Sequence, residues 1–130
     1  MALPVILCVD DEKIVTDTLT TQLRSEFGED YDYEAASDVD EAWELIDDLA
    51  SDGLPLKLII CDWLMPVQKG DKFLLEVHQK WPQVKLIMLS GHADEDAVER
   101  LKNLVTDFKF VRKPWTREDF LPLIRQTLSE

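Results

Sequence analysis

The chain has 130 residues, of which 45% are hydrophobic, and this length suits one folded domain of roughly 100 to 150 residues spanning residues 1–130. Its 27 Asp and Glu outnumber its 14 Lys and Arg and give a formal net charge of −13, which disfavours direct binding to nucleic acid or to an anionic membrane surface. Since no apolar stretch approaches the roughly 20 residues that span a bilayer, we expect a soluble, cytoplasmic protein.

Five apolar runs of strand length alternate with segments of helical period. The first, third and fourth runs are almost continuously apolar, which is typical of central parallel strands covered on both faces. The second run alternates more and is therefore predicted to be an edge strand. Cys8 and Cys61 lie inside the first and third runs without a zinc-ligand spacing, which predicts buried free thiols. The predicted strands cover residues 5–9, 31–36, 56–61, 85–90 and 108–111.

Between the strands, apolar side chains recur at helical spacing and predict five helices, the first over about residues 12–26. Residues 37–40 are typical of a capping box before the second helix, and Asp94 and Thr116 are the predicted N-caps of the fourth and fifth. Gly53 and Pro82 are expected to end the second and third. The predicted apolar stripes are Val15, Leu19, Leu23 and Phe27; Ala42, Ile46, Leu49 and Ala50; Phe73, Leu74, Val77 and Trp81; Val98, Leu101, Leu104 and Val105; and Phe120, Leu121, Ile124 and Leu128.

Five β-α units in this length predict an open, doubly wound α/β sheet, because parallel strands need helical crossovers that cover both faces. A closed eight-fold barrel would need nearly twice the chain. Ligands of such sheets bind at the carboxyl ends of the strands, near the point where the strand order reverses. The residues that follow each apolar run are therefore the candidates for function.

Polar side chains stand at the ends of four of the five predicted strands, namely Asp10 and Asp11, Asp62, Ser90 and Lys113. Taken singly, each has a structural explanation as a helix cap, a turn former or a solvated charge. Taken together, they are predicted to meet at one edge of one sheet, where three carboxylates would face one ammonium and one hydroxyl.

Closely spaced carboxylates favour a bound cation, because like charges raise each other's pKa. Hard oxygen ligands without sulfur or imidazole select Mg²⁺ or a similar divalent ion such as Mn²⁺. A carboxylate beside such an ion and a lysine can attack phosphorus, since the positive charges neutralise the charge on the transferring oxygens. The strand ends therefore suggest phosphoryl chemistry.

These residues resemble the receiver domain of two-component response regulators, a CheY-like family, over essentially the whole chain. Each motif alone is a weak signal, but four of them occur in the expected order and at the expected strand ends. The motifs are Val9-Asp10-Asp11-Glu12, the segment 62–70 (Asp-Trp-Leu-Met-Pro-Val-Gln-Lys-Gly), Leu89-Ser90-Gly91 and Lys113-Pro114.

The resemblance implies a flavodoxin-like strand order 2-1-3-4-5 and a protein that is not an enzyme beyond its own phosphorylation and dephosphorylation. Asp62 matches the phospho-acceptor, which takes a phosphoryl group from a sensor histidine kinase or a histidine phosphotransfer protein. Lys113 matches the lysine that pairs first with the acceptor and then with the phosphoryl oxygens. The implied metal ligands are Asp10, Asp11, Asp62 and the backbone carbonyl of Leu64.

The resemblance also implies a conformational switch. Ser90 matches the hydroxyl that binds the phosphoryl group, and Phe110 matches the aromatic residue that then turns inward. The surface formed by the fourth helix, fifth strand and fifth helix, including residues 94–106 and 115–128, is expected to carry the output. A homodimer, or a downstream output protein or domain, is the expected partner there.

Two features depart from the pattern or tune it. Phe110 lacks the hydroxyl of a tyrosine, so only packing can drive its inward turn. Leu64 and His92 lie two residues beyond the acceptor and the switch hydroxyl, at positions that in this family help to set the rate of dephosphorylation. An apolar Leu64 cannot orient the attacking water, and we expect a long phosphorylated lifetime.

Several alternatives stay open at this point. The chain could be a stand-alone receiver or the receiver of a longer protein, and it could be a degenerate, phosphorylation-independent interaction module. A magnesium-dependent aspartyl phosphatase of the haloacid-dehalogenase type would need a second aspartate where Leu64 stands, and a flavodoxin-like carrier would need a glycine-rich phosphate loop where residues 10–12 stand. The four tryptophans are predicted to be packing residues, with Trp63 a natural fluorescence probe beside the acceptor.

Overall fold

Five parallel strands form one sheet in the order β2-β1-β3-β4-β5, as the resemblance implied. The computed structural model describes residues 3–53 and 55–130, so residues 1, 2 and 54 of the predicted domain lie outside the described part. Strand order reverses at the β1/β3 boundary, where ligands of doubly wound sheets bind. The strands are β1 (Val5–Val9), β2 (Asp32–Ala36), β3 (Leu56–Cys61), β4 (Lys85–Ser90) and β5 (Lys109–Arg112).

The continuously apolar strands begin and end where the sequence predicted. β1, β3 and β4 match residue for residue, because burial on both faces favours an almost continuously apolar run. β2 starts one residue later than predicted, and β5 is displaced by one residue. β2 is an edge strand, as predicted, and only Ala36 in it is buried.

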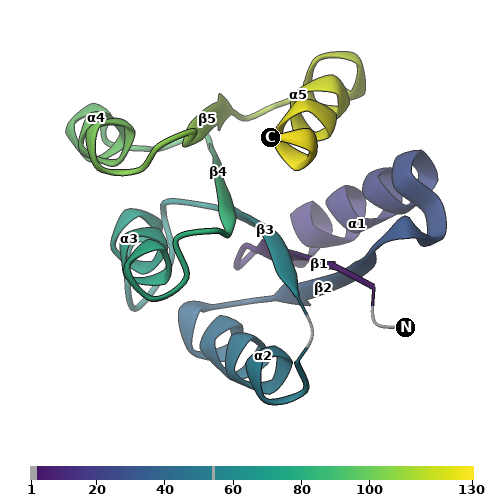
Figure 1. The fold of residues 1–130 in the computed structure, drawn as a ribbon. Coiled ribbons are helices and arrows are strands. Elements are labelled where there is room, and N and C mark those ends of the chain that lie inside the picture. Colours follow the sequence, from purple (N-terminus) through teal and green to yellow (C-terminus); the bar gives the residue numbers. More distant parts are fainter. Residues whose placement is uncertain (1–2, 54) are drawn as a thin grey trace.

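Helices cover both faces of the sheet (Figure 1). α2, α3 and α4 pack on one face, and α1 and α5 pack on the other. Within the described residues, no helix is long and apolar enough to cross a membrane. The helices are α1 (Lys13–Phe27), the short 3-10 helix η1 (Gly28–Asp30), α2 (Val39–Ser51), α3 (Gly70–Lys80), α4 (Glu95–Leu104) and α5 (Arg117–Ser129).

Successive side chains of the central strands alternate between the two helical layers. On β1, Leu7 and Val9 join the core under α2, α3 and α4, whereas Cys8 joins the core under α1 and α5. Cys61 lies in the first of these cores, so the two cysteines occupy opposite faces of the sheet. Both are buried and free, as predicted.

The predicted helix caps form. Asp38, the N-cap of α2, accepts a hydrogen bond from the backbone N–H of Glu41 at 2.7 Å. The Glu41 carboxylate accepts one from the N–H of Ser37, the residue before the N-cap, at 2.6 Å, an arrangement close to a capping box. Asp94 and Thr116 accept hydrogen bonds from backbone N–H groups in the first turns of α4 and α5. Each cap contributes about 1 kcal/mol to helix stability.

The prediction that Leu104 belongs to the buried stripe of α4 is wrong, because its side chain is 53% exposed. Leu104 is the last residue of α4. At about 100° per residue it lies to one side of the stripe that Val98, Leu101 and Val105 form, and those three residues are buried.

Candidate functional site

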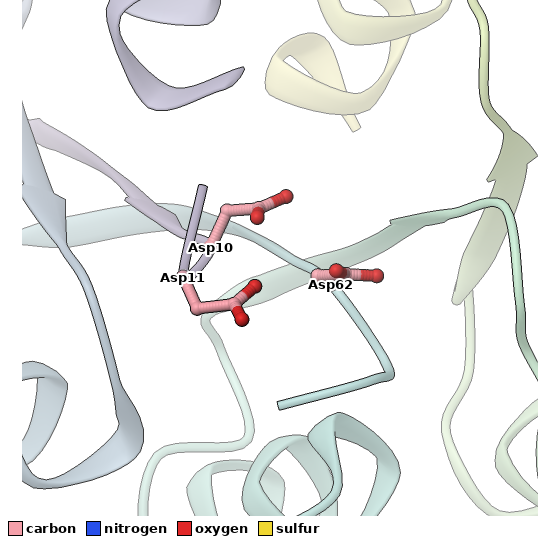
Figure 2. Close-up of side chains that lie close together, drawn as sticks. All are labelled: Asp10, Asp11 and Asp62. Carbon is pink, nitrogen blue, oxygen red and sulfur yellow. The ribbon is translucent and has the colours of Figure 1, made fainter. Parts of the chain in front are cut away.

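Three aspartates stand at the carboxyl ends of the two central strands (Figure 2). Asp10 and Asp11 follow β1, and Asp62 follows β3. The backbone N–H of Asp10 donates to Ala36 O at 3.1 Å, and that of Asp62 donates to Val9 O at 3.0 Å. Because these bonds continue the sheet ladder one residue past each strand, the sheet itself positions the two side chains.

Lys113 reaches the same edge from the segment after β5. Its backbone N–H donates to Ser90 O at 3.2 Å. Its Nζ donates to Asp10 Oδ2 at 2.7 Å and lies 3.4 Å from Asp62 Oδ2. Lys113 therefore contacts both Asp62, the predicted acceptor, and Asp10. These aspartates lie 51 and 103 residues before Lys113 in the sequence, respectively.

Burial governs the electrostatics of this cluster. Asp10 is 3% exposed, and its desolvation, together with the charge of Asp62, raises its pKa against the opposing hydrogen bonds from Lys113 and from the N–H of Glu12. Burial alone would lower the pKa of Lys113, but the hydrogen bond to Asp10 and the charges of Asp62 and Asp10 outweigh it, and the pKa is raised. Lys113 therefore carries its positive charge at neutral pH.

The donor set fits a divalent cation. One carboxylate oxygen from each of Asp10, Asp11 and Asp62 lies within 4.8 Å of the other two. In the described part of the chain, Lys113 is the one basic side chain paired with any of them, so three carboxylates and one ammonium carry a formal charge of −2. Oxygen ligands and excess negative charge are what Mg²⁺ requires of a protein site.

The two oxygens of Asp62 have different partners. Oδ1 accepts a hydrogen bond from the backbone N–H of Trp63 at 2.8 Å, and Oδ2 faces Lys113. The residue is 6% exposed but borders an open cavity of about 710 Å³. The cavity can admit a phosphoryl group, and its lining includes Asp11, Asp62, Leu64, His92, Lys113 and Trp115.

The predicted switch residues lie on the paired strands β4 and β5, in different surroundings. Ser90 ends β4, is fully buried, and its Oγ accepts a hydrogen bond from the backbone N–H of His92 at 3.2 Å. Phe110 is half-buried in β5 and borders a separate hollow beside α4, where the Arg112 guanidinium lies 5.5 Å from the centre of its ring. Ser90 thus lies at the strand-end edge beside Lys113, and Phe110 lies beside α4.

The structure adds two residues whose contacts the sequence did not reveal. Residues 63–69, here called the acceptor loop, connect Asp62 to α3. The indole N–H of Trp63 donates to Asp71 Oδ1 at 2.9 Å, and the indole N–H of Trp115 donates to Gln22 Oε1 at 2.9 Å. The sequence could indicate only that a half-buried indole N–H needs a hydrogen-bond acceptor. It does not indicate which side chain supplies that acceptor.

Comparisons with known proteins agree with this geometry. The family model of the response regulator receiver domain matches residues 6–125. The hydrogenase transcriptional regulatory protein HoxA of Cupriavidus necator is 32% identical over 124 residues, which are 95% of this chain and 24% of HoxA, so the chain spans about a quarter of that relative.

Two solved structures share the fold along almost their whole length. The CheY-like response regulator receiver domain protein of Methanospirillum hungatei JF-1 superposes with a TM-score of 0.85 at 27% identity, covering 98% of this chain and 95% of that one. The beryllofluoride-activated NtrC4 receiver domain dimer superposes with a TM-score of 0.77 at 28% identity, covering 96% of each chain. The similarity therefore extends over both helical layers and the whole sheet.

Proposed function

This chain belongs to the response regulator receiver domain family, and on that premise we propose that it accepts a phosphoryl group on Asp62 from a phosphohistidine. The donor is a sensor histidine kinase or a histidine phosphotransfer protein. The observation that carries the proposal is the buried Asp62 carboxylate, held between the N–H of Trp63 and the ammonium of Lys113 at the mouth of an open cavity.

In the proposed transfer, a carboxylate oxygen of Asp62 forms a bond to phosphorus while the bond from phosphorus to the donor imidazole breaks, and the imidazole keeps the electron pair. Lys113 stabilises the negative charge on the transferring oxygens, which is the main form of catalysis available to phosphoryl transfer. Asp10 keeps the ammonium in place through its 2.7 Å hydrogen bond. The chain thereby catalyses its own phosphorylation and dephosphorylation and turns over no separate substrate.

Asp10, Asp11, Asp62 and the backbone carbonyl of Leu64 are the proposed ligands of Mg²⁺ or Mn²⁺. When bound, the ion supplies positive charge to the transferring phosphoryl oxygens. The support for this assignment is the convergence of the three carboxylates and their uncompensated charge.

The proposed output is a population shift that begins at Ser90 and ends at Phe110. A phosphoryl group on Asp62 offers the buried Ser90 hydroxyl a new acceptor. An inward turn of Phe110 would then release its contact with Arg112 and reshape the surface of α4, β5 and α5. That surface is the proposed site for homodimerisation or for an output partner.

The experiment is a fluorescence titration with Mg²⁺ and then with beryllofluoride or an acyl phosphate, on the wild type, Asp62→Ala and Asp62→Asn. We expect a response to Mg²⁺ and a second response to the donor that both variants lose, together with a mass increase of one phosphate in the wild type alone. Trp63→Phe serves as the control that assigns the signal to the indole beside the acceptor. A wild type that gains no phosphate would refute the proposal in favour of a degenerate interaction module.

A further inference from the structure

Trp63, the residue after the proposed phospho-acceptor, forms hydrogen bonds through both its backbone and its indole ring. Its backbone N–H donates to Asp62 Oδ1 at 2.8 Å, and its indole Nε1–H donates to Asp71 Oδ1 at 2.9 Å. Asp71 is the second residue of α3. A single residue therefore connects the acceptor carboxylate to the first turn of a helix.

The surroundings of this connection restrict its motion. The Asp71 side chain is 18% exposed, and the Trp63 ring packs against the core beneath α2, α3 and α4. Lys69 Nζ lies 5.1 Å from the ring centre, and the N–H of Gly70 donates to Trp63 O at 2.8 Å. The carbonyl, the backbone N–H and the indole N–H of Trp63 each form a hydrogen bond.

We propose that Asp71 is a positioning residue for the phospho-acceptor. By holding the indole, Asp71 keeps the Trp63 N–H directed at Asp62 Oδ1, which leaves Oδ2 turned toward Lys113 and the cavity. The inference rests on the proposed role of Asp62 and adds to it a residue that does not touch the reacting atoms. Loss of the Asp71 acceptor frees the indole, lets the acceptor loop sample other orientations and lowers the fraction of Asp62 in the reactive orientation.

The hydrogen bond, and not the charge of Asp71, carries this role. The other carboxylate oxygen, Oδ2, lies 3.9 Å from an Arg100 side-chain nitrogen, and that arginine side chain is 61% exposed. Such a long and solvated ion pair contributes little. Arg100→Ala is consequently a matched control that changes the charge around Asp71 without removing its bond to Trp63.

The experiment compares Asp71→Ala with Asp71→Asn. Both lose the negative charge at the start of α3 and the ion pair with Arg100, but only asparagine keeps an oxygen that can accept from the Trp63 indole. The first readout is amide hydrogen exchange at the Trp63 N–H, followed by NMR. The second is the rate at which an acyl phosphate phosphorylates Asp62 at saturating Mg²⁺.

In Asp71→Ala we expect exchange at the Trp63 N–H to accelerate, and phosphorylation to slow, each by about tenfold. Asp71→Asn and Arg100→Ala should stay within about twofold of the wild type in both readouts. Trp63→Phe removes the same hydrogen bond from the indole side and should reproduce the slower phosphorylation, which keeps the test informative if Asp71→Ala fails to fold.

Three results would overturn the inference: equal exchange at Trp63 in the alanine and asparagine variants, equal phosphorylation rates in those two variants, or a Trp63→Phe protein that reacts like the wild type. Failure of the proposed function has a different signature. In that case the wild type itself gains no phosphate, while exchange at Trp63 still reports whether Asp71 holds the indole.

Discussion

Gly70→Ala is expected to disrupt the close backbone packing between the start of α3 and the proposed phospho-acceptor, Asp62. Gly70 is the first residue of α3, and its backbone lies directly against the end of β3. A Cβ added to it would stand 2.0 Å from Asp62 O, 2.9 Å from Asp62 C and 3.0 Å from Trp63 Cα. All three contacts are with backbone, so no side chain can rotate away to make room.

The size of the effect follows from these distances. Lengthening the shortest contact from 2.0 Å to the 3.4 Å of an ordinary contact requires a backbone shift of about 1.4 Å. Overpacking of this kind costs about 1–3 kcal/mol, and a shift that large also breaks the 2.8 Å hydrogen bond from Gly70 N–H to Trp63 O, which contributes about 1 kcal/mol. We expect a loss of about 2–4 kcal/mol in the free energy of unfolding.

Urea unfolding monitored by circular dichroism measures this loss, and Gly91→Ala is the matched control. A Cβ on Gly91 would lie 3.7 Å from Lys113 Cβ, an ordinary contact, so that variant should lose less than about 1 kcal/mol. Phosphorylation of Asp62 should also slow in Gly70→Ala, because the acceptor's own carbonyl is displaced. Equal unfolding free energies for the two alanine variants would refute the reasoning.

Three further predictions concern the lysine of the site, the residue at the cavity and the two buried thiols. Lys113→Met removes the cation that contacts the acceptor, and intact-mass kinetics should show phosphorylation of Asp62 by an acyl phosphate slowed by about 100-fold. Leu64→Asn places a polar group at the cavity, and the phosphoryl group should be lost faster than in the wild type; an unchanged decay rate would remove the proposed role of this position. Burial raises the pKa of Cys8 to about 12 and that of Cys61 well above its ordinary value, so both thiols stay neutral and should resist an aromatic disulfide reagent at pH 8 until urea unfolds the chain.

The sheet was predictable because its strands obey a strong local constraint. β1, β3 and β4 lie in the interior of the sheet with a helical layer on each face, so their residues are almost continuously apolar. The apolar runs end at the site, where the polar residues Asp10, Asp62 and Ser90 are still buried. β2 and β5 lie at the edges, where this constraint is weaker, and their predicted bounds were shifted at one or both ends. The end of α4 is likewise weakly constrained, and the apolar Leu104 there is 53% exposed although the pattern predicted that it would be buried.

The sequence predicts those parts of the site that the strand topology alone brings together. Parallel strands place their carboxyl ends at one edge, so Asp10, Asp62 and Lys113 could be brought together without any knowledge of side-chain geometry. Which oxygen of Asp62 faces Lys113 and which faces Trp63 depends on the shape of the acceptor loop, and that shape follows no periodic pattern.

Gly70 and Asp71 illustrate this difference between topology and loop geometry. By pattern, Asp71 is only an acidic residue in the first turn of α3, where the helix dipole favours a carboxylate. Its hydrogen bond with the Trp63 indole depends on the shape of the acceptor loop. Substitutions at these two neighbouring positions should therefore have different effects. Gly70→Ala is expected to lower both the free energy of unfolding, by about 2–4 kcal/mol, and the rate of phosphorylation, because the added Cβ has no space. Asp71→Ala, compared with Asp71→Asn, should lower the rate of phosphorylation with a smaller loss of stability, about 1 kcal/mol, because it removes one hydrogen bond.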